Sequence, residues 1–339
     1  MRQVIVASIL VGCLVAFTPA ISANTIAFTE SLDSNPFSPG GNFGVSNAPG
    51  LAPDTYNQFT WDGSTAPKYT GDSTGSLKVV YDSTKPAVRL ERALPTTVGI
   101  DQDFSFGTRM TVRSNGLVAP DTDYFEMTFG LAGHAATGGD RTGSMTTSAD
   151  VYNQVEFAYF PNLAFWGGPT LQVNAFGAQI PGKTPFNNYA SPDFNEGDLG
   201  GNGAGQIKSL PLNTPLDVDI SYKASTQIAT LKVSRVESNG SLTQLMLSDT
   251  GVIDIDLSGA GFQSGSFSSN NFDKTHPFSL DTLVVSSYFD SWASIPGSPS
   301  LYANVEYDQF RFQTETVPEP LSLLLLASGA MVVLRRWSH

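Results

Sequence analysis

The stretch LDVDISYKASTQIATLKV, residues 216–233, decides the fold class, because its apolar side chains recur at every second position. Leu, Val, Ile and Tyr occupy positions 216, 218, 220 and 222, and Ala, Leu and Val occupy positions 229, 231 and 233. A period of two is typical of β-strands with one buried and one exposed face. The polar residues Lys223–Thr226 between the halves indicate a tight turn. The stretch therefore predicts an antiparallel hairpin.

The same alternation recurs wherever apolar residues are dense. It predicts strands near residues 104–113, 125–131, 155–159 and 301–312, and strand-like segments at 77–81, 87–92, 171–176, 242–247 and 280–288. A phase shift between Tyr307 and Phe310 predicts a β-bulge at Asp308-Gln309. No stretch between residues 24 and 316 keeps a helical period. We therefore expect an all-β fold, an antiparallel two-sheet jelly-roll sandwich with long loops.

Four long polar stretches separate these segments, at residues 36–76, 132–150, 181–206 and 258–277. Each is rich in Gly, Ser, Asn, Thr or Pro. A compact sandwich does not need connections of this length, so we expect them to be functional or locally mobile.

The composition agrees with strands joined by many turns. The 339 residues include Gly 32, Pro 21, Phe 22 and Tyr 11, and only 14% are charged. A net charge of −13 argues against nucleic acid and anionic lipid as partners, because both need a basic face. It suits cations, neutral polysaccharide or solubility outside the cell. Cys13 is the only cysteine, so thiol catalysis, thiolate metal sites and disulfides are excluded once the N-terminal segment is removed.

The N-terminal segment has the pattern of a secretory signal peptide. Arg2 supplies the positive start, Val4–Phe17 the apolar core, and small residues up to Ala23 a cleavage position before Asn24. The letters LVGC at residues 10–13 also match a lipoprotein cleavage pattern. We interpret that match as chance, because the apolar run continues beyond the cysteine. Residues 1–23 are thus assigned to the signal peptide, and residues 24–316 to one β-sandwich domain.

The C-terminal segment, residues 317–339, has a second address-like pattern. Val317, Pro318, Glu319 and Pro320 precede the apolar run Leu321–Leu334, and Arg335 and Arg336 follow it. As a helix this run is about 21 Å long, against a hydrocarbon core of about 30 Å, so it is a marginal transmembrane anchor. The two arginines would stay on the cytoplasmic side and leave the preceding chain outside the inner membrane.

This tail resembles the PEP-CTERM sorting signal of Gram-negative bacteria. The resemblance implies an exosortase-type membrane protease as partner, with cleavage near Pro318-Glu319-Pro320 after transient inner-membrane anchoring. It also implies release to the cell surface or extracellular matrix of a host that makes exopolysaccharide. A simple single-pass C-terminal anchor is the alternative.

A second resemblance covers most of residues 25–313. Phe28-Thr29-Glu30, Asp103-Phe104-Ser105-Phe106, the hairpin around Tyr222 and Asn304-Val305-Glu306-Tyr307-Asp308 look like the strands of concanavalin A-like jelly rolls, of laminin G or legume lectin type. The resemblance implies that the first and last strands pair. That pairing would place Phe28 near Phe310.

Acidic clusters are the first candidates for chemistry. Asp121, Asp123 and Glu126 lie at the start of a predicted strand, but alternation sends Glu126 to the opposite side from the other two. Glycosidases of the concanavalin A-like fold carry carboxylates at alternate positions on one strand, and no Glu-x-Asp-x-Glu run occurs here. We therefore name no catalytic residue and do not expect an enzyme, with a glycoside hydrolase as the lesser alternative.

Calcium is the candidate cofactor for a second acidic set. The four residues lie in a Gly-rich stretch and offer oxygen ligands of the kind that hard cations prefer: Asp193, Asn195, Glu196 and Asp198. A plain exposed acidic loop is the alternative. Glu30 and Asp308 form another candidate pair if the terminal strands lie side by side.

Two other patterns argue against familiar enzymes. His134, His276 and His339 are too scattered for a zinc motif. Residues 71–75, Gly-Asp-Ser-Thr-Gly, match the letters of a nucleophile elbow, which requires a strand before it and a helix after it. Here a polar stretch precedes and a strand follows, so we interpret the segment as a turn.

Aromatic residues are the remaining lead, because sugar rings stack on exposed aromatic rings. Trp166 and Tyr288 are the candidate platforms, and packing beneath loops is the alternative for both. The sequence thus predicts an exported protein that binds extracellular polysaccharide. A structural or adhesive matrix protein without a small ligand is the alternative function.

Overall fold

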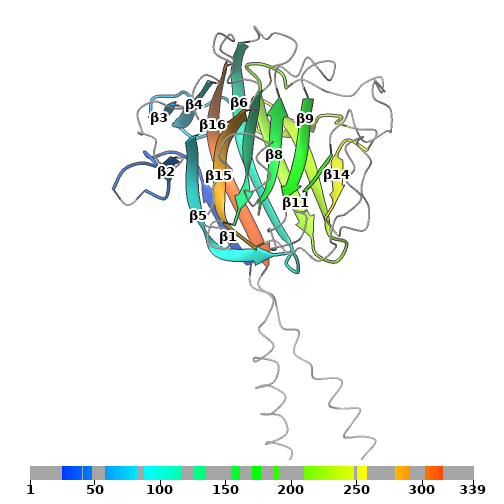
Figure 1. Ribbon diagram of the computed structural model, residues 1–339. Helices are drawn as coiled ribbons and strands as arrows, with labels where there is room; N and C mark the ends of the chain where they lie inside the picture. Colours follow the sequence, from blue (N-terminus) through cyan, green and yellow to red (C-terminus); the bar gives the residue numbers. More distant parts are fainter. Residues whose placement is uncertain are drawn as a thin grey trace, which may run out of the picture. The chain divides into compact units, whose positions relative to one another are not determined.

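The computed structural model describes most of the chain between residues 25 and 315. The described ranges are 25–39, 41–47, 58–82, 88–116, 125–133, 154–160, 170–176, 187–190, 210–247, 250–257, 279–289 and 302–315. All regular elements in these ranges are β-strands, β1 to β16 (Figure 1). Residues Ile26–Thr314 form one compact unit.

The first sheet, sheet A, has nine strands. Its main order is β13 (Leu242–Gln244), β12 (Ile228–Val236), β11 (Pro215–Lys223), β6 (Phe104–Gly116), β16 (Tyr302–Glu315), β4 (Ser76–Asp82) and β3 (Gln58–Asp62). Two further strands complete it: β1 (Thr25–Glu30) pairs with β16, and β14 (Ile253–Asp256) pairs with β12.

The second sheet, sheet B, has seven strands. Its order is β10 (Asn187–Ala190), β9 (Thr170–Phe176), β8 (Gln154–Phe160), β7 (Phe125–Ala132), β15 (Ser279–Phe289), β5 (Val88–Gly99) and β2 (Gly44–Asn47). Neighbouring strands run antiparallel, and the chain crosses repeatedly between the sheets, as in a jelly roll. The expected fold class is confirmed.

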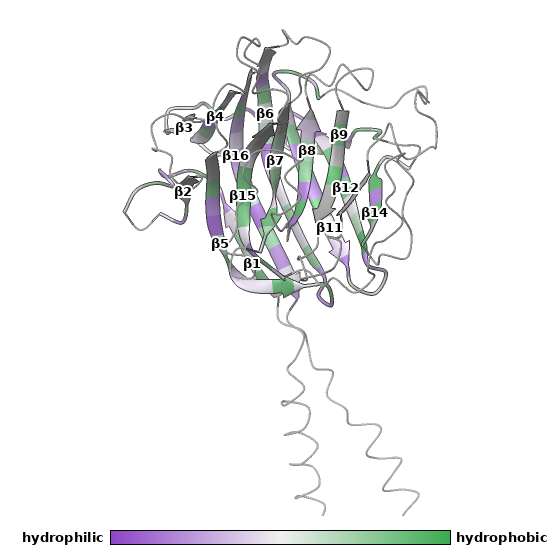
Figure 2. Ribbon diagram, viewed as in Figure 1, coloured by the Kyte–Doolittle hydropathy of each residue, from purple (hydrophilic) through white to green (hydrophobic). Residues whose placement is uncertain are grey.

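The core lies between the two sheets. Along the strands, hydrophobic and hydrophilic residues alternate (Figure 2), and the hydrophobic set of each sheet faces the other sheet. The ring of Phe129 from sheet B lies 5.6 Å from the ring of Phe106 and 5.7 Å from that of Phe310, both from sheet A. These aromatic contacts join the sheets into one hydrophobic core.

The predicted hairpin is present as β11 and β12. Leu216 pairs with Arg235 and Ile220 with Leu231 in one unbroken antiparallel register. The turn is closed by a hydrogen bond from the Thr226 amide to the Lys223 carbonyl oxygen, 3.3 Å long. The predicted bulge is also present, as a register shift between Tyr307 and Gln309 where β16 pairs with β6.

The terminal strands pair as the resemblance implied, but the aromatic contact differs by two residues. β1 pairs with β16. The ring of Phe28 stacks on Phe312 at 5.9 Å, whereas Phe310 packs deeper, 5.4 Å from Phe43. Phe310 has no exposed surface, because the opposing sheet already fills the space around it.

Several strands lie where the sequence predicted loops. Residues 36–76 contain β2 and β3, and residues 181–206 contain β10. The strands β2 and β10 have only four residues each and are rich in Gly, Ser and Asn, and β3 has only five residues, so their alternation is too short to detect. Residues 253–256, which were not predicted as a strand, form β14. Conversely, the segment predicted at 242–247 is a strand only at Leu242–Gln244.

Both terminal segments, residues 1–23 and 317–339, lie outside the described residues. Within the described ranges, no helix has the length and apolar character needed to cross a membrane.

Candidate functional site

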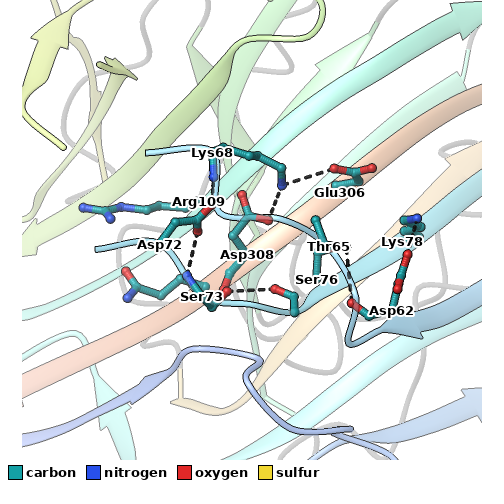
Figure 3. Close-up of polar contacts among 12 residues, drawn as sticks. Asp62, Thr65, Lys68, Asp72, Ser73, Ser76, Lys78, Arg109, Glu306 and Asp308 are labelled. Atoms are coloured by element: carbon teal, nitrogen blue, oxygen red, sulfur yellow. Dashed lines mark hydrogen bonds and ion pairs between the residues drawn. The ribbon is translucent and has the colours of Figure 1, made fainter. Parts of the chain in front are cut away.

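The bulge in β16 creates a buried polar site on the face of sheet A that points away from the core (Figure 3). β4 pairs with β16 from Tyr302 to Tyr307, and the bulge follows at Asp308. The Asp308 side chain is only 2% exposed, although it belongs to the outer face. The Lys68 ammonium binds its Oδ1 atom.

Lys68 belongs to the connection between β3 and β4, residues 63–75, which we call the β3–β4 loop. The loop is shaped by its own side chains: Asp72 accepts hydrogen bonds from the backbone amides of Lys68, at 2.7 Å, and Ser73, at 2.9 Å. A positive φ of 86° at Gly71 allows the reversal. The Thr70 amide donates to the Ser238 carbonyl oxygen at 2.9 Å, which ties the loop to the turn after β12.

A chain of charges extends from Asp308 along sheet A. Lys68 Nζ lies 3.1 Å from Glu306 Oε2, and Arg113 Nη2 lies 2.5 Å from the same oxygen. Two buried atoms of this site have no hydrogen-bond partner, namely Asp308 Oδ2 and the hydroxyl of Thr111, which pairs with Glu306 in the register. Orphaned buried oxygens of this kind are rare in native proteins.

The pKa values of Asp308 and Glu306 are shifted in opposite directions. Burial raises the pKa of Asp308 from 3.8 to about 6; Lys68 opposes the shift, and the negative charges of Asp72 and Glu306 add to it. Burial also acts to raise the pKa of Glu306, but the hydrogen bonds and charges of Arg113 and Lys68 outweigh it and lower the pKa. Asp308 is therefore the carboxyl that the site leaves incompletely compensated.

A second ionic group adjoins the site on the same face. Asp217 accepts from Arg311 at 2.6 and 3.0 Å and from Arg109 Nε at 3.1 Å. The Arg109 guanidinium lies 5.0 Å from the ring centroid of Tyr69, another residue of the β3–β4 loop. Burial raises the pKa of the Tyr69 hydroxyl well above its usual range. The loop is thus packed against charged groups of β6 and β16.

The residues of the nucleophile-elbow pattern take part in this site, but as a turn. The Ser73 hydroxyl donates to the carbonyl oxygen of Gly75 at 2.8 Å, and strand β4 follows. His134, His276 and His339 all lie outside the described residues. The geometry agrees with the turn interpretation.

Sheet B carries a different surface, which we call the polar face of sheet B. Its nine residues lie in three register rows across β15, β7 and β8 and alternate with core residues: Thr282, Ala132 and Gln154; Val284, Gly130 and Glu156; Ser286, Thr128 and Ala158. An antiparallel sheet commonly turns such a face to water. Here eight of the nine residues, all except Ala132, are buried.

The polar groups of this face are partly satisfied by one another. The Thr128 and Ser286 hydroxyls lie 2.9 Å apart. The Gln154 Nε2 atom is buried and has no hydrogen-bond partner. A Cβ atom on Gly130 would lie 2.4 Å from the Cβ of Glu156, so only glycine fits beside that side chain. Sequence reasoning missed this surface; the glycine inside a strand pattern was its one available signal.

The candidate cation pair Glu30 and Asp308 does not converge on one site, because each carboxyl has its own partners. Glu30 accepts from Arg92 at 2.7 Å and from Asn42 at 3.1 Å, whereas Asp308 binds Lys68. Among the described residues, no group of three or more His, Cys, Asp or Glu side chains is arranged to hold a metal ion.

The remaining predicted site residues fall mostly outside the described part of the chain. Tyr288 lies in β15 and pairs with Glu126 of β7. The others are outside the described ranges: Trp166, Asp193, Asn195, Glu196, Asp198, Asp121, Asp123, Ala23, Val317, Pro318, Glu319, Pro320, Arg335 and Arg336.

No protein-family model and no curated protein matches the chain. Solved structures of plant lectins are similar to it. Peanut lectin with a nine-residue peptide is 10% identical, with a TM-score of 0.40 over 87% of this chain and 100% of the lectin. The acidic lectin of winged bean, complexed with methyl-α-D-galactose, is 10% identical, with a TM-score of 0.44 and coverages of 87% and 100%. Lectin II from Ulex europaeus is 13% identical, with a TM-score of 0.38 and coverages of 86% and 99%. The likeness concerns the fold alone.

Proposed function

We propose that this protein is an exported surface or matrix protein whose sandwich binds extracellular polysaccharide on the polar face of sheet B. The single observation that carries the proposal is the set of polar side chains on that face. Polar side chains from three adjacent strands are buried there on the side of the sheet that points away from the core.

The chemistry of this face suits a glycan. Sugar hydroxyls both donate and accept hydrogen bonds, and ligand sites place a few polar groups among apolar ones. On this face Gly130, Ala132 and Ala158 lie between the polar side chains. The buried Gln154 amide nitrogen needs an acceptor, which a sugar hydroxyl can supply.

The export part of the proposal rests on the two ends of the chain. The signal-peptide pattern of residues 1–23 and the PEP-CTERM resemblance of residues 317–339 support secretion and processing by an exosortase-type protease. The net charge of −13 supports partners other than nucleic acid.

The test is binding of the purified full-length protein to a panel of bacterial and plant polysaccharides, with calcium and again with chelator. For a glycan that binds, we expect Gln154→Ala to weaken affinity about tenfold, the effect of one lost hydrogen bond to the ligand. Lys232→Ala, an exposed change on sheet A, should leave affinity unchanged. Equal binding by the two variants would move the site elsewhere, and Trp166→Ala would then be the next variant.

A structural or adhesive role is the second candidate, and one surface favours it. Leu242 and Met246, 47% and 48% exposed, lie in and just after β13, the last strand of the sheet A order. Exposed apolar residues beside a sheet edge promote association. Self-association of the protein without added glycan, together with no binding across the panel, would support this role.

A further inference from the structure

We propose that the β3–β4 loop is a proton-coupled strap: its closure over Asp308 takes up one proton at that carboxyl, so the loop is held more firmly in acid than at neutral pH. This inference is independent of glycan binding. It rests on the bulge, on the loop contacts and on the unpartnered oxygen of Asp308.

The bulge determines where the carboxyl lies. The extra residue in β16 places Asp308 between the register pairs Tyr307–Met110 and Gln309–Arg109. The loop then lies against Asp308: Lys68 binds Oδ1, and the Ser73 hydroxyl is 3.4 Å from the Asp308 carbonyl oxygen. The residue becomes 2% exposed. Removing this loop from sheet A would return the carboxyl to water.

The closed site disfavours the ionised form of Asp308. Oδ1 has Lys68, but Oδ2 is buried without any donor, and a buried carboxylate oxygen without a partner is costly. A proton taken from solvent forms an O–H bond at Oδ2 and changes the carboxyl from −1 to neutral. Oδ1 remains an acceptor for Lys68. Protonation therefore removes the unfavourable charge without removing the contact that anchors the loop.

The surrounding charges point the same way. The loop presents Lys68, Asp72 and Tyr69 to this site; β16 presents Glu306; β6 presents Arg109 and Arg113. The Lys68 charge is shared with Glu306, and Arg109 binds Asp217, so neither cation serves Asp308 alone. Asp72, Glu306 and Asp308 thus outnumber the cations Lys68 and Arg113. One proton added to Asp308 makes the number of negative charges equal to the number of positive charges.

The direction of the coupling follows from linkage. In the closed loop the pKa of Asp308 is about 6, and in an open, solvated loop the ordinary value of 3.8 applies. Because the closed form binds the proton more tightly, a falling pH favours closure and a rise through about 6 favours opening. Opening would separate Tyr69 from Arg109 and the Thr70 amide from the Ser238 carbonyl oxygen.

Hydrogen exchange of the full-length protein tests the strap. The reporter is the amide of Thr70, which donates to the Ser238 carbonyl oxygen outside the loop. After correction for intrinsic exchange rates, we expect its protection to fall about tenfold between about pH 5 and about pH 7.5. The amides of β11 and β12 should not follow this change.

Two variants make the outcome specific. Asp308→Asn should keep the Thr70 amide protected at both pH values, whereas Asp103→Asn, at a carboxyl paired with Lys223, should retain the tenfold fall. Protection that is independent of pH in the natural protein would overturn the proposal. Should Asp308→Asn fail to fold, a carboxyl-carbon NMR titration of the natural protein decides, because a midpoint for Asp308 near 4 would also overturn it.

Discussion

The hydroxyl groups of Tyr81 and Tyr307 lie 2.6 Å apart in the core of the sandwich and hydrogen-bond to each other. Tyr81 is 0% exposed and Tyr307 is 1% exposed. Neighbouring strands β4 and β16 therefore bring two polar groups into an apolar interior, where each satisfies the other.

We expect Tyr81→Phe to lower the free energy of unfolding by about 1–3 kcal/mol, because it leaves the buried Tyr307 hydroxyl without a partner. The double variant Tyr81→Phe, Tyr307→Phe should regain most of the loss, since it removes both polar groups. Urea unfolding of the two single variants and the double variant measures the coupling. Additive losses would mean that each hydroxyl has a different partner.

Removal of Lys68 should destabilise the protein through Asp308. We expect Lys68→Met to cost about 3 kcal/mol near pH 7.5, because it leaves a buried carboxylate unpaired. The cost should be smaller near pH 5, where Asp308 takes up a proton. Adding Asp308→Asn to Lys68→Met should restore stability at neutral pH. Denaturant unfolding at both pH values is the measurement, and a cost equal at the two would contradict the assignment.

Glu306 should show the opposite pH dependence. Its pKa is lowered from 4.5, so the stability it contributes is present above 4.5 and is lost as the pH falls through its folded-state pKa. Glu306→Gln should therefore destabilise the protein near pH 7 and destabilise it less as the pH falls toward 3. The difference in unfolding free energy between the natural protein and this variant, followed from pH 7 to pH 3, checks the sign.

Gly130 should not tolerate a side chain. A methyl group there would meet the Cβ of Glu156 at 2.4 Å and the Val155 carbonyl oxygen at 2.6 Å. We expect Gly130→Ala to cost about 1–3 kcal/mol through overpacking and to weaken glycan binding on the polar face of sheet B. Gly44→Ala in β2 is the matched control, because no atom lies within 4 Å of its added Cβ. Thermal unfolding of the two variants compares them.

The position of the bulge was the part of the Asp308 site that could be predicted from the sequence. The phase shift after Tyr307 predicted an irregularity at Asp308-Gln309, and the structure confirms it. The partner of Asp308 was not predictable in this way. Lys68 lies 240 positions away in a stretch with no periodic pattern, and a salt bridge leaves no local trace in a single sequence.

The polar face of sheet B shows the same limit. The alternation in residues 155–159 predicted a half-buried strand, and Val155, Phe157 and Tyr159 are buried in the core. The same alternation would place the intervening Glu156 on the solvent side. Glu156 is nevertheless only 3% exposed, which the pattern of the strand itself does not indicate.

By itself, the sequence determined the all-β class, the β11–β12 hairpin, most of the longer strands and the bulge. Period-two alternation and turn residues are local properties of the sequence. A strand that buries one face is enough to produce this pattern, whatever its neighbours are. Tertiary packing set the strand order, the short strands β2, β3 and β10, the Lys68–Asp308 contact and the burial of the polar face of sheet B. Each of these features depends on which distant segments of the chain pack against one another, and that is determined by the packing of the complete core.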